Sequence, residues 1–152
     1  MQRYRSRFSL VPLVLLTVGS LVALAVSPVQ AKSHASAGAK LVKTIHGHIL
    51  VTPKGRTLYI FAADSPNKSS CYGECAKFWP PRLVTSGTTV PHKVSGIPGT
   101  FGVTTRTDNT QQLTYNGAPL YTFAGDKKAG DVTGEGVNAS GGYWWAVVTA
   151  GR

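Results

Sequence analysis

Two cysteines are the first residues of this chain whose type and spacing could do chemistry. Cys71 and Cys75 are the only cysteines and lie four positions apart. In an exported chain such a pair most simply forms a disulfide that closes a small loop. The spacing excludes a C-x-x-C redox motif, and because no His follows Cys75, covalent haem attachment is also excluded.

Copper is the alternative for this cysteine pair, because thiolates suit Cu(I). The histidines that would complete such a site are His46, His48 and His92. The first two flank a single glycine and are expected on the same side of a strand, where an exposed pair is the simpler interpretation. Copper is disfavoured because Trp79 stands four residues after the second cysteine, where a two-copper centre would have a His, and because no Met follows residue 31.

A ten-residue pattern occurs twice and ends each time in a carboxylate. Residues 55–64 (GRTLYIFAAD) and 117–126 (GAPLYTFAGD) share six identities. The repeat-motif residues are Tyr59, Phe61, Asp64, Tyr121, Phe123 and Asp126. Because an internal repeat records a repeated structural unit, each Asp is expected to accept backbone N–H bonds in the turn after its strand. The sharper alternative places both carboxylates together across a pseudo-twofold axis as an acid/base or metal pair.

The elements that must position these residues are short strands. Apolar or alternating stretches separated by Gly, Pro, Asn and Asp predict strands at 48–52, 57–61, 83–85, 102–106, 111–115, 119–123 and 144–149. Asn116-Gly117 is a strong hairpin signal. One helical turn is expected within 71–78. We therefore expect an all-β fold: a compact small domain of two related hairpin repeats that share one core with pseudo-twofold symmetry.

The N-terminus predicts export. Three arginines precede the charge-free, mostly apolar run 10–26, and Val29-Gln30-Ala31 resembles a cleavage site. We assign 1–31 to a signal peptide, 32–45 to a flexible linker and 46–152 to the β domain, with repeat copies at about 46–81 and 106–150. The alternative is an uncleaved anchor, because the apolar run approaches the length of a spanning helix.

The charge of the chain bears on its partners. Cleavage after residue 31 would remove three of the 16 basic residues and none of the six acids, leaving 13 bases and a net charge of +7. Such an excess favours anionic cell-surface polymers or lipid headgroups as partners. Nucleic acid is not expected for an exported protein, and nothing in the pattern demands an oligomer, so we expect a monomer.

Combined motifs carry a resemblance. Three parts of the sequence form one combined pattern: residues 58–64, the run 70–81 with its cysteines and Trp-Pro-Pro, and the related residues 106–126 with their continuation to Trp145. Together they resemble the bacterial secreted-repeat lipoproteins that share a Y-x-[FWY]-x-x-D motif. The resemblance spans about 46–151 and implies an extracytoplasmic location but no known activity. Many members have a lipidated cysteine at the cleavage site, whereas here Lys32 follows Ala31, which implies a chain without a lipid anchor.

Three functions follow from these observations. The leading hypothesis is a secreted, disulfide-closed binding or structural module of the bacterial envelope, with no catalytic activity and no cofactor. The alternative is an extracytoplasmic redox or copper-handling accessory protein that uses Cys71 and Cys75. A small hydrolase built on Asp64 and Asp126 is the third, and no nucleophile motif of the G-x-S-x-G type supports it.

Overall fold

The computed structural model describes residues 41–149, and in this part of the chain strands predominate over a single short helix. The strands are β1 (Lys43–Ile45), β2 (Ile49–Val51), β3 (Tyr59–Phe61), β4 (Leu83–Val84), β5 (Phe101–Thr105), β6 (Gln111–Tyr115), β7 (Ala118–Pro119), β8 (Asn138–Ala139) and β9 (Gly142–Ala146). The helix α2 (Glu74–Phe78) lies where one helical turn was expected. The predicted all-β class is confirmed.

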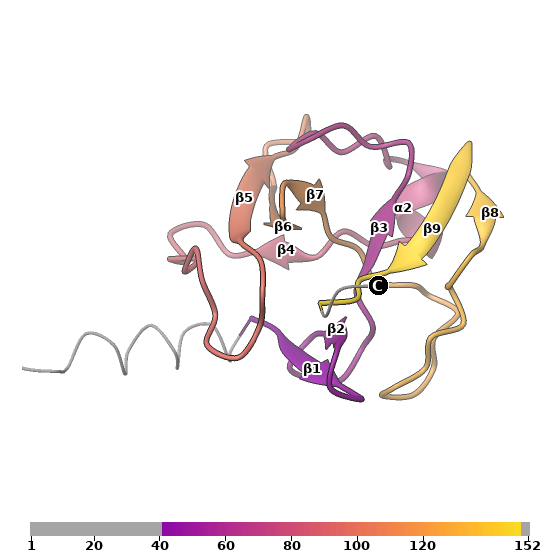
Figure 1. Ribbon diagram of the computed structural model, residues 1–152. Helices are drawn as coiled ribbons and strands as arrows, with labels where there is room; N and C mark the ends of the chain where they lie inside the picture. Colours follow the sequence, from indigo (N-terminus) through magenta and orange to yellow (C-terminus); the bar gives the residue numbers. More distant parts are fainter. Residues whose placement is uncertain (1–40, 150–152) are drawn as a thin grey trace, which may run out of the picture.

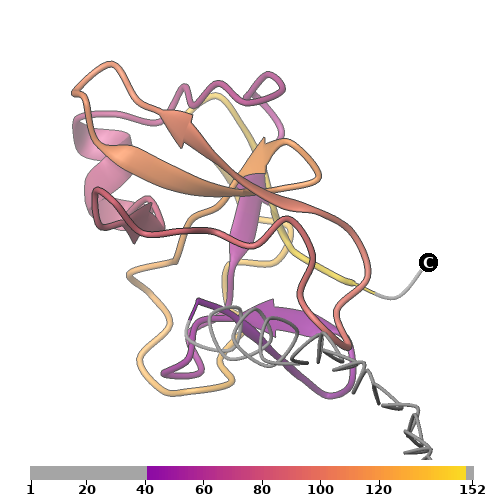
Figure 2. The same cartoon turned by 90° about the vertical axis from the view of Figure 1, so that its left-hand side faces the viewer.

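The strands form three small antiparallel sheets. β1 pairs with β2, β9 lies between β3 and β8, and β6 lies between β4 and β5 and also pairs with β7. Figures 1 and 2 show the β5–β6 ladder at one end of the molecule and the β1–β2 hairpin at the other. No helix within residues 41–149 is long and apolar enough to cross a membrane.

Both predicted hairpins are present. Asn116 and Gly117 adopt positive φ angles of 49° and 80° and turn β6 into β7. In the first repeat the turn 53–56 contains Gly55 at φ 84°, and the amide of Leu58 donates to the carbonyl of Leu50 at 2.9 Å. These turn residues tolerate the left-handed conformation, which explains why the sequence located both hairpins.

The predicted strand 119–123 is less regular than expected. β7 ends at Pro119, and Tyr121 then forms isolated bridges with Tyr59 and Pro81. The amide of Thr122 donates to the carbonyl of Pro80 at 2.9 Å. Because Pro80 has no N–H, it cannot return the bond from Thr122, and the next bond between the two segments runs from the amide of Arg82 to the carbonyl of Leu120 at 2.7 Å. The pairing is therefore limited to isolated bonds and no full ladder forms.

The two repeats exchange strands. The amide of Val147, in the second repeat, donates to the carbonyl of Leu58 in the first at 2.9 Å. The corresponding amide of Arg82, in the first repeat, donates to the carbonyl of Leu120 in the second at 2.7 Å. Each hairpin is therefore completed by the final segment of the other repeat. The predicted shared core and pseudo-twofold relationship follow directly from this exchange.

The core has an aliphatic and an aromatic part. Alternation along residues 58–61 divides them: Tyr59 and Phe61 lie in the aromatic cluster, whereas Leu58 lies in the aliphatic cluster and Ile60 packs against it. The aliphatic cluster also contains Val42, which is 1% exposed.

The structure differs from the sequence prediction near the start of the domain. Val42 is buried and β1 occupies Lys43–Ile45, inside the range 32–45 that was assigned to a linker. The physical reason is the apolar Leu41-Val42 pair, which the composition of the surrounding small and polar residues concealed. The predicted signal peptide and most of the predicted linker lie outside the described residues.

Candidate functional site

The repeat-motif tyrosines and aspartates contact one another across the two repeats. The hydroxyl of Tyr59 donates to Asp126 Oδ2 at 2.9 Å, and the hydroxyl of Tyr121 donates to Asp64 Oδ2 at 2.7 Å. The backbones of the two tyrosines also exchange a pair of N–H···O bonds, both of 2.9 Å. The local pseudo-twofold axis therefore passes between Tyr59 and Tyr121.

The other oxygen of each carboxylate accepts hydrogen bonds from the segment that follows its own copy of the motif. Asp64 Oδ1 accepts from the amide and the hydroxyl of Ser70, both at 2.7 Å. Asp126 Oδ1 accepts in the same way from the amide and hydroxyl of Thr133, at 2.9 and 2.6 Å. The expected turn contacts are present in both copies. Asp126 is 1% exposed and the two carboxylates share no hydrogen-bond partner among these contacts, so the geometry gives no support to an acid/base pair.

Burial raises the pKa of the two tyrosines well above the ordinary value of 10. For Tyr59, removal of the phenol from water is the largest cause, and the hydrogen bond to Asp126 and its charge add to it. The pKa of Tyr121 is raised in the same way by burial and by Asp64. Both hydroxyls therefore remain protonated and serve as donors to the carboxylates at neutral pH.

The phenylalanines of the repeat motif close an aromatic stack. Phe61 stacks on Trp144 with centroids 4.1 Å apart, Trp144 stacks on Trp79 at 4.0 Å, and Trp79 stacks on Phe123 at 4.2 Å. The order alternates between the repeats, so each copy contributes an outer Phe and an inner Trp. Every side chain of the motif thus has a structural role in joining the two copies.

The cysteines are joined to each other. Cys71 and Cys75 form a disulfide, and Cys71 is fully buried. The expected disulfide is present, and it uses both sulfurs that Cu(I) would require as thiolates. The bond closes the loop from which α2 begins, one turn before Trp79 enters the aromatic stack.

The histidines give no support to a metal site. His46 and His48 are exposed in the turn that joins β1 to β2, and His46 has a φ of 48°, so they do not share one side of a strand as expected. The glycine between them favours a tight turn at this place. His92 is exposed in the loop between β4 and β5. No group of three or more potential ligands among His, Cys, Asp and Glu occurs within residues 41–149.

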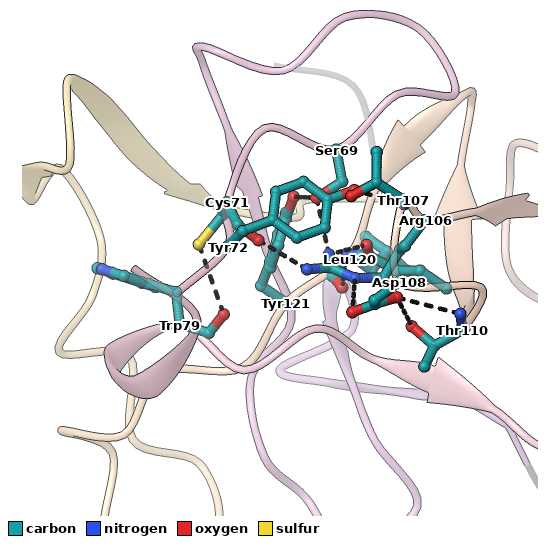
Figure 3. A network of polar contacts seen from close by, with 11 residues as sticks. Ser69, Cys71, Tyr72, Trp79, Arg106, Thr107, Asp108, Thr110, Leu120 and Tyr121 are labelled. Atoms are coloured by element: carbon teal, nitrogen blue, oxygen red, sulfur yellow. Dashed lines mark hydrogen bonds and ion pairs between the residues drawn. The ribbon is translucent and has the colours of Figure 1, made fainter. Parts of the chain in front are cut away.

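Arg106 holds the cysteine loop against the second repeat. It is 4% exposed, and its guanidinium donates to Ser69 Oγ, to Gln112 Oε1 and to the carbonyl of Cys71, each at 2.7 Å. The same group lies 4.2 Å from the centroid of the Tyr72 ring (Figure 3). In the sequence, Arg106 stands out only as the first residue of the range 106–126 that carries the resemblance. Arg106 directly follows β5, at the start of the turn 106–110 that leads into β6.

A pair of surface grooves is related by the same pseudo-symmetry. The first, the apolar groove, has a volume of about 610 Å³ and is lined by Ile60, Tyr115, Ala118, Trp145, Ala146 and Val147 among others. The second, the basic groove, has a volume of about 640 Å³ and is lined by Thr52, Pro53, Lys54, Arg56, Pro81, Arg82, Leu83 and Thr122. Residues at equivalent repeat positions line both grooves, but their chemistry differs.

Comparison with known proteins adds the family. A family model described as a secreted repeat of unknown function matches residues 40–82 and 102–148, one segment for each repeat. No curated protein sequence and no solved structure matches the chain. The two matched segments correspond to the two halves that exchange strands in the fold, and together they cover more than half of the sequence. The chain belongs to this family of secreted repeats of unknown function.

Proposed function

We propose that this protein is a non-catalytic binding module that acts at the bacterial cell envelope after export. The observation that carries the proposal is how the polar groups of the repeat motif are used. The carboxylates of Asp64 and Asp126 accept bonds on both oxygens from within the fold, and the two tyrosines serve them as donors. These groups build a rigid scaffold and are committed to it.

Variation between the two copies supports a binding role. A duplicated fold retains the residues that its architecture needs, whereas residues at equivalent surface positions can diverge without loss of the fold. Here the repeat motif is retained and the lining of the two grooves has changed. Grooves of several hundred cubic ångströms on a small, rigid domain are suited to ligand binding.

The net positive charge of the chain supports anionic molecules as the class of partner. The sequence has 16 basic and six acidic residues, and the envelope carries anionic polymers and lipid headgroups. Attraction between exposed charges acts over about 8–10 Å at physiological ionic strength and weakens as salt increases. Attachment by this means requires no lipid anchor.

Cosedimentation with isolated bacterial envelopes tests this function. The purified exported protein should sediment with envelopes at about 50 mM salt and be released progressively as the concentration rises toward 0.5 M. An unrelated basic protein of similar size and net charge is the control for non-specific attraction. Failure to sediment, or sedimentation no greater than that of the control, would contradict the proposal. Intact mass of the same preparation should show the loss of two hydrogens at Cys71 and Cys75.

A further inference from the structure

The two grooves can be compared position by position. Arg82 and Val147 occupy equivalent places, because their amides donate to the carbonyls of Leu120 and Leu58 in the two repeats. Arg82 lines the basic groove and Val147 lines the apolar groove. The same fold position thus has a guanidinium in one copy and an isopropyl group in the other.

A second pair of positions has diverged in the same direction. In the aligned repeats, the residue after the turn glycine is Arg56 in the first copy and Ala118 in the second. Again the arginine lines the basic groove and the small apolar residue lines the other. The exposed side chain of Lys54 lies in the turn directly before Arg56 and is the third cation of the basic groove. The positive charge of this groove is therefore not a requirement of the repeated architecture.

The two guanidinium groups are held by neutral partners. Arg56 donates from one terminal nitrogen to the carbonyl of Phe123 at 2.9 Å. Arg82 donates to the carbonyls of Leu83 at 2.9 Å and Leu41 at 3.3 Å. Carbonyl oxygens orient a guanidinium without neutralising it, so both groups retain their full charge in fixed positions.

No carboxylate of the described residues compensates these charges by direct contact. The side-chain ion pairs within residues 41–149 are Lys77 with Glu74 and Arg106 with Asp108, and none involves the basic groove. Asp131 interacts electrostatically with Arg56, but its Oδ2 already accepts from the amides of Lys127 and Lys128 at 2.8 Å. The groove lining itself contains no acidic residue.

Burial makes this uncompensated charge costly. The Nε atoms of Arg56 and Arg82 are buried and have no hydrogen-bond partner in the described part of the chain. Removal from water also lowers the pKa of Arg82. A partly buried charge is stabilised by an opposite charge beside it, which an anion in the groove would supply.

We propose that the basic groove binds a phosphate group of an envelope ligand, with Arg56 and Arg82 as its principal contacts and Lys54 as an additional charge at its rim. This inference rests on the proposed binding function and adds a site and a ligand class to it. Arginine forks match phosphate oxygens in bidentate fashion. Three cations that line one groove from two segments of the chain, 54–56 and 82, suit a phosphate with its several acceptor oxygens better than a carboxylate with two.

Substitutions that copy the other repeat provide the test. Arg56→Ala and Arg82→Val introduce the residues that the fold already accommodates at the equivalent positions 118 and 147. The matched control is Lys68→Gln with Lys93→Gln, which removes two exposed positive charges from positions that do not line the groove. Lys54→Gln, at an exposed turn position, is a variant with little risk to folding. Thermal unfolding establishes that each variant is folded.

Binding is measured by calorimetry with soluble polyphosphate and by cosedimentation with vesicles of phosphatidylglycerol, using phosphatidylcholine vesicles as the neutral reference. The Arg56→Ala, Arg82→Val double variant should bind at least about tenfold more weakly, because two charge-assisted contacts are lost, and Lys54→Gln by a few-fold. The control should stay within about twofold. Binding of polyphosphate alone assigns a soluble polymer, and binding of the vesicles assigns a lipid headgroup.

Two results of the polyphosphate and vesicle measurements would overturn the inference. The first is a folded double variant that binds polyphosphate and vesicles as tightly as the wild type, and the second is a wild-type protein that binds neither. The same proteins are also sedimented with envelopes. Retention of the double variant on envelopes would refute the phosphate site while the general binding function stands, whereas loss of envelope binding by the wild type itself would refute both.

Discussion

The indole rings of Trp79 and Trp144 stack at the junction of the two repeats, with centroids 4.0 Å apart and planes inclined by 2°. Each ring comes from the segment that its own repeat contributes to the other repeat's hairpin. The outer faces of the pair are covered by Phe123 and Phe61. The fold therefore depends on this contact from both sides, and an isolated half would expose it.

Replacement of either tryptophan should be strongly destabilising. Trp79 and Trp144 are 1% and 0% exposed, so Trp79→Ala and Trp144→Ala should each lower the free energy of unfolding by about 3–5 kcal/mol through loss of buried area and creation of a cavity. Trp145→Ala is the matched control, because Trp145 is 36% exposed, and should cost about 1–2 kcal/mol, clearly less than Trp144→Ala. Urea unfolding measures all three, and equal effects at 144 and 145 would contradict the central role of the stack.

Removal of one tyrosine hydroxyl should leave a carboxylate without its donor. Tyr59→Phe removes the hydroxyl donor to Asp126, which is buried, whereas Tyr121→Phe removes the hydroxyl donor to Asp64, which is partly exposed. Since water can replace the donor at Asp64 more readily, we expect a loss of about 1–3 kcal/mol for Tyr59→Phe and a smaller loss for Tyr121→Phe. Equilibrium urea unfolding gives both values. A larger loss for Tyr121→Phe than for Tyr59→Phe would show that burial of the carboxylate does not set the size of the effect.

Stability should fall at alkaline pH. The pKa of Tyr59 and of Tyr121 is raised above 10 in the folded protein, chiefly by burial. A raised folded pKa means that the stabilisation is complete below pH 10 and is lost as the pH rises further, by up to about 1.4 kcal/mol per pH unit for each tyrosine. Urea unfolding between pH 8 and 11 measures this slope, and absorbance at 295 nm follows phenolate formation. The Tyr59→Phe, Tyr121→Phe double variant should show a shallower slope, and an unchanged slope would assign the effect to other groups.

Opening the disulfide should weaken the fold without abolishing it. The bond between Cys71 and Cys75 closes a loop of only a few residues, for which loop entropy gives about 2 kcal/mol. The Cys71→Ala, Cys75→Ala variant should therefore unfold at lower urea concentration, and reductant should have no further effect on it. Because the bond is partly shielded by the burial of Cys71, reduction of the wild type should be slow in the absence of denaturant. Rapid reduction with no change in stability would show that the loop is held by Arg106 alone.

The sequence by itself determined the repeat, the two hairpins, the all-β class and the cysteine pairing. These depend on local chemistry: Asn-Gly and Pro-Lys-Gly turns, alternation along residues 57–61, and the proximity of two cysteines in an exported chain. Such features act over a few residues, so a linear pattern reports them.

Only the tertiary structure decided how the two copies are joined. The strand exchange, the crossed contacts of Tyr59 with Asp126 and Tyr121 with Asp64, and the burial of Arg106 bring together groups that lie 35 or more residues apart. The first strand was missed because its own residues are exposed or half-buried, and Val42 directly before it joins the aliphatic cluster only in the folded domain. The divergence of the two grooves is also visible only in the tertiary structure. Backbone hydrogen bonds, and not the short repeat in the sequence, define Arg82 and Val147 as equivalent positions.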